Sequence, residues 1–268
     1  MQQKDGALDF LQEVCRNRKV VLDVHHPDRL WDLPGERAIY HCQAFADQVQ
    51  EHVKQIQFIP LMCPEMGEGG RALFQRETKY VIGWHGLWIP HKGVEKLIQA
   101  VALMRDRRID VSFFAIGGLH DINLETRQKS WDYWIQCNDA AFRHDVQPFC
   151  QMWNELLPYP DVRATLEVCD VMCLPYDLIE FHDQSSAAAA AIAVERPLVV
   201  TKVPMFDEWA DTAHFLSGDS PACLADELGC LLRDTGAMKH YVTTAKLAHA
   251  ERSRQSISEQ YKVFVEGV

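Results

Sequence analysis

The sequence predicts an α/β fold in which parallel strands alternate with helices. Short apolar runs, typical of buried strands, alternate along the chain with longer stretches in which apolar residues recur at helical spacing. Repeated strand–helix–strand units of this kind build parallel sheets. With 268 residues, of which 47% are hydrophobic and 24% charged, the chain is long enough to bury a core in one large or two small domains.

The strands are predicted from apolar runs that polar residues, glycine or proline interrupt. In chain order they are expected at 19–26, 38–42, 57–62, 80–86, 111–118, 146–153, 171–176 and 197–203.

The helices are predicted from the amphipathic stretches between these runs. In chain order they are expected at 7–17, 44–55, 93–107, 124–144, 160–170, 185–194 and 220–236, followed by a long polar-faced helix over 239–264. Trp131 and Trp134 lie three residues apart on one face of the helix 124–144, and we expect both in the core.

A domain boundary is predicted at 63–78, which is rich in glycine and proline, mixed in charge and without periodicity, as linkers are. The segment 79–237 contains enough strands for a complete doubly wound, Rossmann-like domain. The segment 1–62 is a reduced N-terminal α/β part, small for a free-standing domain. The segment 238–268 contains the closing helix.

Composition excludes several classes of function. The net charge of −11 weighs against a phosphate-backbone partner, because nucleic-acid-binding proteins usually carry a basic excess. No apolar run is long enough to span a membrane, and the first residues do not have the pattern of a signal peptide. The nine cysteines mostly lie in apolar runs, which favours free thiols in a reducing, cytoplasmic compartment. Their spacing predicts no metal site.

The first segment that carries chemistry spans 82–100. A strand is predicted to end in Gly83 and Gly86, and glycines at that point let a ligand approach the backbone closely. Lys92 then stands at the start of a helix, where the helix dipole is already positive, so its charge is useful if it faces an anion. A tight turn with a solvated lysine is the alternative.

The second segment spans 175–200. A strand leads into a polar loop, and an alanine-rich helix follows. The free N–H groups at the start of that helix would point into the crevice at the strand ends, where they could bind phosphate. An ordinary capped helix in the core is the alternative. The polar residues concerned are Glu180, His182, Asp183, Gln184, Ser185 and Ser186.

Together with F-F-A-I-G-G (113–118) and C-D-V-M-C-L-P-Y (169–176), these segments resemble the C-terminal, donor-binding domain of GT-B glycosyltransferases of the family 4, or group 1, type. The resemblance runs from about residue 80 to 215. It implies a GT-B-like fold, a UDP- or GDP-sugar as donor, a hydroxyl acceptor and retention at the anomeric carbon. It implies neither a cofactor nor an obligatory metal. It also implies that 238–268 packs back on the N-terminal part.

The resemblance assigns roles to residues of this chain. Lys92 and the amides of the helix that begins at 184–186 would hold the donor diphosphate and stabilise it as the leaving group. The glycine loop and the glycine that follows the next strand would lie against the donor. The donor-binding residues implied are Gly83, Gly86, Leu87, Lys92, Gly117, Trp153, Tyr176, Glu180, Gln184, Ser185 and Ser186.

The sequence departs from the family pattern at four positions. Leu87 stands where the family commonly has an arginine that contacts the diphosphate. His182 and Ala190 replace two glutamates, the second of which usually binds the ribose, and Glu195 replaces a glycine. His182, or Asp183 or Glu180 if the loop shifts, could take the place of the first glutamate beside the transferred sugar. His182 and Asp183 are therefore the catalytic candidates beside Lys92.

Two further predictions concern the base and the acceptor. Trp153 follows a strand where the family usually holds the nucleobase, and it could stack on a base; core packing is the alternative. His25 and His26 end the first strand and could lie on the acceptor side, because the segment 1–62 resembles only the closing part of a GT-B N-terminal domain. Surface histidines at a strand end are the alternative.

Three functions follow from these observations. The first is a nucleotide-sugar-dependent glycosyltransferase that acts on a glycan, a lipid-linked glycan or another hydroxyl acceptor. The second is a sugar-nucleotide-binding subunit without turnover, which the short N-terminal part and the replaced glutamates favour. The third is a transferase that glycosylates modified bases in nucleic acid, which the acidic charge opposes. Association with further copies or with a partner subunit is left open.

Overall fold

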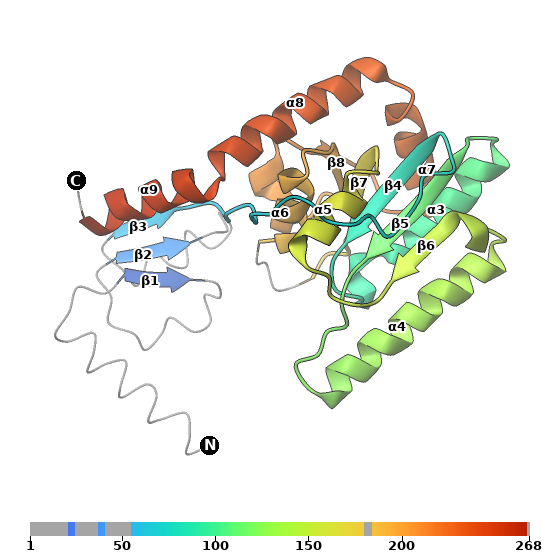
Figure 1. The fold of residues 1–268 in the computed structure, drawn as a ribbon, viewed down its shortest axis with the longest axis horizontal. Helices are drawn as coiled ribbons and strands as arrows, with labels where there is room; N and C mark the ends of the chain where they lie inside the picture. Colours follow the sequence, from blue (N-terminus) through green and yellow to red (C-terminus); the bar gives the residue numbers. More distant parts are fainter. Residues whose placement is uncertain (1–20, 25–36, 41–54, 180–183, 267–268) are drawn as a thin grey trace.

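The computed structural model describes residues 21–24, 37–40, 55–179 and 184–266 (Figure 1). These residues form two parallel sheets. In the smaller sheet the strands lie in the order β1-β2-β3; they are β1 (Val21–Val24), β2 (Arg37–Tyr40) and β3 (Gln55–Phe58). The structure does not describe the helix predicted at 7–17, nor the helix predicted at 44–55 apart from Gln55. The acceptor-side candidates His25 and His26 also lie outside the described residues.

The larger sheet has the order β6-β5-β4-β7-β8-β9. Its strands, all parallel to their neighbours, are β4 (Tyr80–His85), β5 (Val111–Ile116), β6 (Cys150–Trp153), β7 (Val171–Leu174), β8 (Leu198–Val200) and β9 (His214–Phe215). The strand order reverses between β4 and β7. Open α/β sheets bind ligands at such a switch point, outside the carboxyl ends of the strands.

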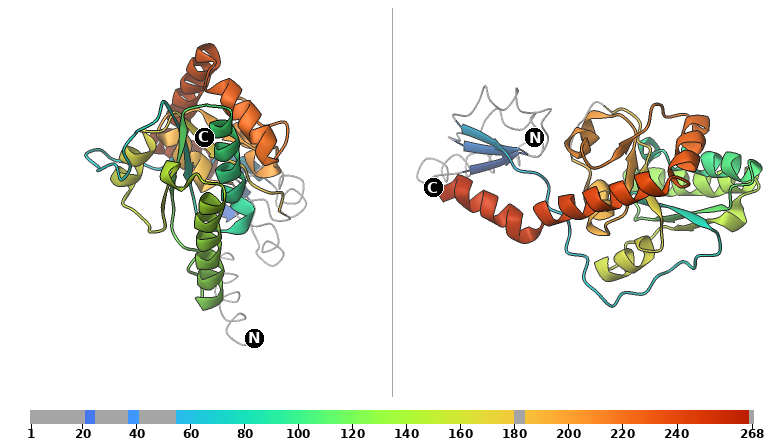
Figure 2. Two further views of the ribbon diagram at one scale, coloured as in Figure 1. Left: turned by 90° about the vertical axis from the view of Figure 1, so that its right-hand side faces the viewer. Right: turned by 90° about the horizontal axis from the view of Figure 1, so that it is seen from above.

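Helices cover both faces of the larger sheet, as Figures 1 and 2 show. They are α3 (Val94–Asp106), α4 (Leu124–Arg143), α5 (Tyr159–Leu166), α6 (Ser186–Ala193) and α7 (Pro221–Leu231). α3 packs against α4 and α7, and α6 packs against α8 (Thr235–Glu251). The arrangement is the doubly wound, Rossmann-like domain that the sequence predicts.

The core lies on the strands of the larger sheet. Every residue of β5 and β7 is buried, because a parallel sheet with helices on both faces leaves no strand face for water. This is why short apolar runs identified these strands in the sequence. α6 is buried along almost its whole length, and its small alanine side chains let it approach the sheet closely.

Three differences between the structure and the sequence prediction concern β6, β9 and the closing helix. The predicted strand 146–153 begins as a short 3-10 helix, η4 (Gln147–Phe149), because Pro148 fixes its own φ at a value that suits the first turn of a helix. β9 was not predicted, since two residues are too few to make a pattern. The predicted helix 239–264 is two helices, α8 and α9 (Arg254–Glu266), which are separated at Arg252 and Ser253.

α9 lies against the smaller sheet (Figure 1). Ile257 on α9 and Ile59, just after β3, form a separate buried apolar cluster, against which Tyr261 and Phe264 also pack. At the junction of α8 and α9, buried Arg252 donates to Glu208 Oε2 at 2.6 Å, and its carbonyl accepts from the amide of Cys63 at 2.9 Å. The closing segment therefore contacts the end of β3, the segment that follows β8 and the segment that connects the two sheets.

The cysteines in the described part of the chain are all free thiols, as the sequence predicts for them. Cys63, Cys137, Cys150, Cys169 and Cys173 are buried, and burial raises the pKa of Cys63, Cys150 and Cys169 to about 12. None of the helices in the described ranges combines the length and apolar composition needed to cross a membrane.

Candidate functional site

The loop that follows β4 is fixed by one buried tryptophan. Trp88 is fully buried, and its indole N–H donates to the carbonyls of Gly117 at 2.9 Å and Trp153 at 3.1 Å. Its own carbonyl accepts from the Ser130 hydroxyl on α4 at 2.6 Å. Trp88 thus connects the loops at the carboxyl ends of β4, β5 and β6 through its hydrogen bonds.

Glycines let these loops approach one another. A Cβ on Gly117 would lie 1.7 Å from the carbonyl oxygen of Gly86, so the β4 and β5 loops touch through backbone atoms. A Cβ on Gly86 would lie 3.8 Å from Ala187 Cβ, which puts the β4 loop beside the start of α6. Gly83 lies inside β4, where a Cβ would collide with Met172 and Cys169, and its predicted contact with the donor stays a prediction.

Lys92 stands between the β4 and β7 loops. It is the last residue of the short 3-10 helix η3 (Pro90–Lys92), and Gly93 follows it with φ +68°. The backbone of Gly93 lies so close to the β7 loop that a Cβ on Gly93 would be 2.1 Å from the carbonyl oxygen of Pro175. The Lys92 ammonium is 3.7 Å from the ring centroid of buried Tyr176, a cation–π geometry. Among the described residues Lys92 makes no ion pair, so its charge is available to an anion.

The start of α6 lies on the other side of the same tyrosine. Buried Ser185 is the N-cap of α6, where its hydroxyl oxygen accepts from the Ala188 amide at 3.3 Å, and it donates to the Tyr176 hydroxyl at 3.5 Å. The amides of Ser186 and Ala187 belong to the first turn, which has no carbonyl partners within the helix. Lys92 and the positive end of α6 therefore converge at Tyr176.

The side chain of Gln184 contacts a distant part of the chain, while the role predicted for the amides at the start of α6 stays a prediction. Its side-chain Oε1 accepts a hydrogen bond from the Leu61 amide at 2.7 Å, which ties the start of α6 to the segment that connects the two sheets. The side chains of Gln184 and Ser185 therefore serve the fold. The other three predicted residues of this loop, Glu180, His182 and Asp183, lie outside the described residues.

A cavity of about 240 Å³ opens beside the β4 loop at the carboxyl ends of the strands. His85, the last residue of β4, lines it with Ile116 and Gly117 from β5 and with Glu155, Leu156, Leu157, Tyr159 and Val162. Burial lowers the pKa of His85 to about 4, so the imidazole is neutral at physiological pH. Its buried Nδ1 has no hydrogen-bond partner among the described residues.

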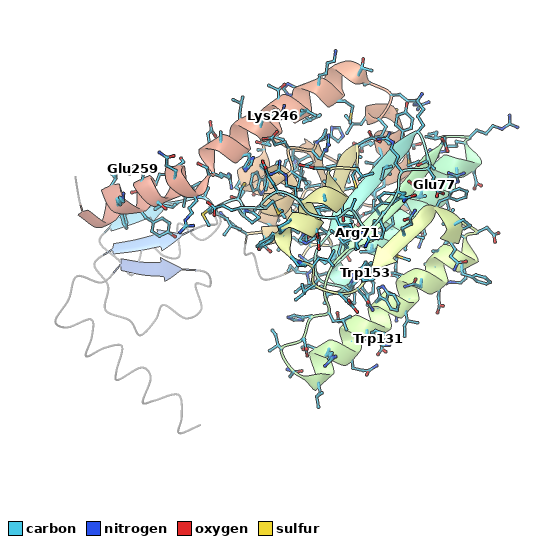
Figure 3. All side chains as sticks on the ribbon, viewed as in Figure 1. Arg71, Glu77, Trp131, Trp153, Lys246 and Glu259 are labelled. Carbon is cyan, nitrogen blue, oxygen red and sulfur yellow. The ribbon has the colours of Figure 1, made fainter. Side chains whose placement is uncertain are left out.

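This arrangement can bind a molecule with a planar or apolar end and an anionic end. The cavity offers apolar walls and the Nδ1 of a neutral histidine, and Lys92 with the start of α6 offers positive charge. Trp153, at the end of β6, is partly exposed, so its ring is accessible as a stacking surface (Figure 3). Within the described ranges, no three His, Cys, Asp or Glu side chains gather as metal ligands would.

The family model of the glycosyl transferases group 1 matches residues 79–234. The chain belongs to the group 1 glycosyltransferases. The match covers the larger sheet and the helices around it, including every described residue of the site above. A comparison with curated protein sequences finds no match.

Solved structures show the GT-B fold for this group 1 glycosyltransferase. The sucrose-phosphate synthase of Thermosynechococcus elongatus has a TM-score of 0.68 at 12% identity, over 95% of this chain and 69% of that one. HepE of Anabaena, solved with UDP and glucose, has a TM-score of 0.70 at 14% identity, over 96% and 74%. A UDP-forming trehalose-phosphate synthase of Burkholderia xenovorans, solved with glucose-6-phosphate, has a TM-score of 0.71 at 12% identity, over 97% and 71%.

The departures from the family pattern have clear structural settings. Leu87 is half-buried in the β4 loop, between Gly86 and Trp88. Ala190 is buried on α6 and offers no polar group to a ribose. Glu195, in the place of a glycine, has φ +56°, a left-handed backbone conformation that costs free energy for residues other than glycine.

Two residues of the site were missed by sequence reasoning. Trp88 lies inside the segment 82–100, but its indole partners are 29 and 65 residues away, and no local pattern indicates them. His85 precedes Gly86 and resembles any polar residue at a strand end. Its position at the carboxyl end of a buried strand was the available signal, since ligands bind in the crevice outside the strand ends at a switch point.

Proposed function

We propose that this group 1 glycosyltransferase is a retaining, family 4 type enzyme that transfers a sugar from a UDP- or GDP-sugar to a hydroxyl acceptor. The observation that carries the proposal is the convergence of Lys92 and the start of α6 on Tyr176. A nucleoside diphosphate carries the negative charge that these two positive groups could share. The free, mostly buried thiols agree with a reducing, cytoplasmic setting.

The donor would lie across the β4 loop. Its nucleobase would enter the cavity beside His85, where the neutral imidazole can share a hydrogen bond with a base edge, and Trp153 would stack on it. Its diphosphate would lie between Lys92 and the first amides of α6. Gly86 and Gly117 keep the floor between these two positions free of side chains.

Transfer would depend on stabilising the leaving group. The bond between the anomeric carbon and the diphosphate oxygen breaks, its electron pair goes to that oxygen, and the sugar becomes oxocarbenium-like. Lys92 and the α6 amides would meet the charge where it forms, an effect worth about 10²–10³ in kcat when one such group is removed. The acceptor hydroxyl then bonds to the anomeric carbon on the face that the leaving group vacates, and its proton passes to the departing diphosphate.

The residues beside the transferred sugar are proposed from the resemblance. His182, Asp183 and Glu180 are the candidates that would position the sugar and steady its developing positive charge. His25 and His26 are the candidates on the acceptor side. No metal takes part in this proposal, and nucleotide release is therefore expected to continue in the presence of a chelator.

The test is nucleotide release from a panel of UDP-, GDP- and ADP-sugars, with and without candidate hydroxyl acceptors. Lys92→Ala is expected to lower release from the preferred donor by about 10²–10³. Lys239→Ala, which removes the same charge from an exposed position on α8, is the matched control and should leave release unchanged. Release by Lys92→Ala at the wild-type rate would contradict the role of Lys92.

A second function is a sugar-nucleotide-binding subunit without turnover. Leu87 and Ala190 favour it, because both replace polar groups that the family commonly uses to hold the donor. The same panel separates the two functions. Donor binding that Lys92→Ala weakens, with no release from any donor, would support the binding subunit and exclude the enzyme.

A further inference from the structure

The outward face of α4 carries a row of large apolar side chains. Leu124, Trp131, Ile135 and Phe142 are exposed to 85%, 41%, 41% and 72%. Their spacing of seven, four and seven residues keeps them on one line along the helix, because two helical turns take about seven residues. We call these four residues the α4 stripe. Trp131 thereby corrects the prediction that it lies in the core (Figure 3).

The α4 stripe is not needed to hold α4 on the domain. The opposite side of the helix makes the core contacts, through buried Ser130, Tyr133, Cys137, Ala140 and Ala141. α4 is therefore apolar on two opposite sides, whereas a surface helix ordinarily has one apolar side and one charged side. A hollow of about 470 Å³, lined by Leu119, Leu124, Arg127, Gln128 and Trp131, indents the exposed side. Contiguous exposed apolar surface of this kind marks an interaction site.

The α4 stripe has a symmetry that fits one particular partner. Leu124 and Phe142 are equally far from Tyr133 along the helix, and so are Trp131 and Ile135. If a second copy of α4 lies antiparallel across the stripe, Leu124 meets Phe142 of the second copy, and Trp131 meets Ile135. Gln128 and Asn138 are also equally far from Tyr133, so the side-chain amide of Gln128 lies at the level of the side-chain amide of Asn138 of the second copy.

The charges beside the α4 stripe agree with this pairing. Glu125 and Arg143 lie on the same side of the stripe near opposite ends of the helix, so the antiparallel arrangement brings Glu125 of each copy to Arg143 of the other. On the other side, Arg127 meets Asn138 of the second copy. Asp132 lies close to the symmetry axis, so the pairing places it near Asp132 of the second copy, a contact between like charges. The face also has as many acids as bases, so it has no excess positive charge for an anionic membrane.

We propose that α4 is a homodimer interface, in which two copies of the chain pair antiparallel through the α4 stripe about a two-fold axis at Tyr133. Such an interface is isologous, since each copy contributes the same patch. A single pair of helices covers less surface than the about 800 Å² per partner of a standard stable interface. The dimer is therefore expected to dissociate on dilution.

The first test is sedimentation velocity of the full chain over a range of micromolar concentrations. The wild type should shift from monomer to dimer as concentration rises. Ile135→Glu should remain monomeric, and Leu247→Glu, which places the same charge on an exposed apolar residue of α8, should dimerise like the wild type. Both substituted side chains are exposed, and thermal unfolding monitored by circular dichroism should show that both variants fold.

The second test is a charge exchange that depends on the direction of pairing. Arg143→Glu should raise the dissociation constant of the dimer roughly tenfold, because two ion pairs become two repulsions. Adding Glu125→Arg in the same chain should restore the wild-type value. In a parallel pair Glu125 would meet Glu125 of the second copy and Arg143 would meet Arg143. The exchange would then not restore the wild-type dissociation constant.

Three results would overturn the proposal. One is a wild type that is monomeric at every concentration, and another is a dimer that Ile135→Glu leaves intact. The third is binding of a monomeric chain to vesicles of phosphatidylglycerol that Ile135→Glu abolishes, which would assign the α4 stripe to a lipid surface. Nucleotide release does not enter these measurements, so the dimer and the proposed enzyme can fail independently.

Discussion

Leu87 is the residue at which the site departs most directly from its family. It lies between Gly86 and Trp88 in the β4 loop, where the resemblance places a diphosphate-binding arginine. Leu87→Arg is expected to tighten binding of the preferred nucleoside diphosphate roughly tenfold, since a charge-assisted hydrogen bond contributes about 1.5–3 kcal/mol. Isothermal titration calorimetry measures this, with Leu87→Met as the uncharged control. Equal affinities of the two variants would show that position 87 does not reach the diphosphate.

Substitutions of Glu195 test backbone strain rather than ligand binding. Its φ of +56° costs about 1 kcal/mol or more for a side chain other than glycine, and its carboxylate lies 3.3 Å from His249 and 3.9 Å from Lys246. Glu195→Gly removes both the strain and these contacts, whereas Glu195→Ala removes the contacts alone. Urea unfolding should therefore find the glycine variant more stable than the alanine variant by about 1 kcal/mol. Equal stabilities would mean that the left-handed backbone is not strained.

Part of the candidate site could be predicted from single residues. Lys92 lies two residues before α3 and Ser185 is the N-cap of α6, and local sequence marks such positions. Gln184 could not be assigned in this way, because its partner is the Leu61 amide, 123 residues away. Gly83 lies within the predicted strand 80–86, but no local pattern indicates that it packs against Met172, which is distant in the sequence.

At the scale of elements, the sequence predicts best where burial is uniform. β4, β5 and β7 are buried on both faces, so an apolar run identifies each of them. β9 lies at the edge of the sheet with two residues, and no run of that length is distinctive. The end of α8 was missed for another reason. Helical spacing continues through Arg252 and Ser253, and the break depends on tertiary contacts of Arg252.

The contact between the β4 and β5 loops gives an element-scale prediction. Gly117→Ala would place a Cβ 1.7 Å from the Gly86 carbonyl oxygen, and backbone atoms cannot move aside cheaply. We expect it to lower the free energy of unfolding by about 1–3 kcal/mol and to weaken nucleotide binding. Gly118→Ala, whose Cβ would meet only the flexible end of Leu156, is the matched control and should cost less. The same loss in both variants would contradict a specific loop contact.

At the scale of the whole molecule, one buried ion pair connects parts that are distant in sequence. Arg252, at the junction of α8 and α9, donates to the Glu208 carboxylate at 2.6 Å and to its carbonyl at 3.1 Å, and its guanidinium lies 3.7 Å from the Trp209 ring centroid. The Cys63 amide donates to the carbonyl of the same arginine. The segment that follows β8, the connecting segment and the closing helices therefore meet at one residue.

Arg252→Leu is expected to lower the free energy of unfolding by about 3–5 kcal/mol, because it leaves the Glu208 carboxylate buried without its cation. Arg252→Leu combined with Glu208→Leu should recover much of this loss, since no unpaired charge remains. Arg254→Leu, two residues away in an exposed pair with Glu65, should cost no more than about 1 kcal/mol. Urea unfolding measures all three variants. If the double variant is less stable than Arg252→Leu alone, the loss comes from packing around Trp209 and not from an unpaired carboxylate.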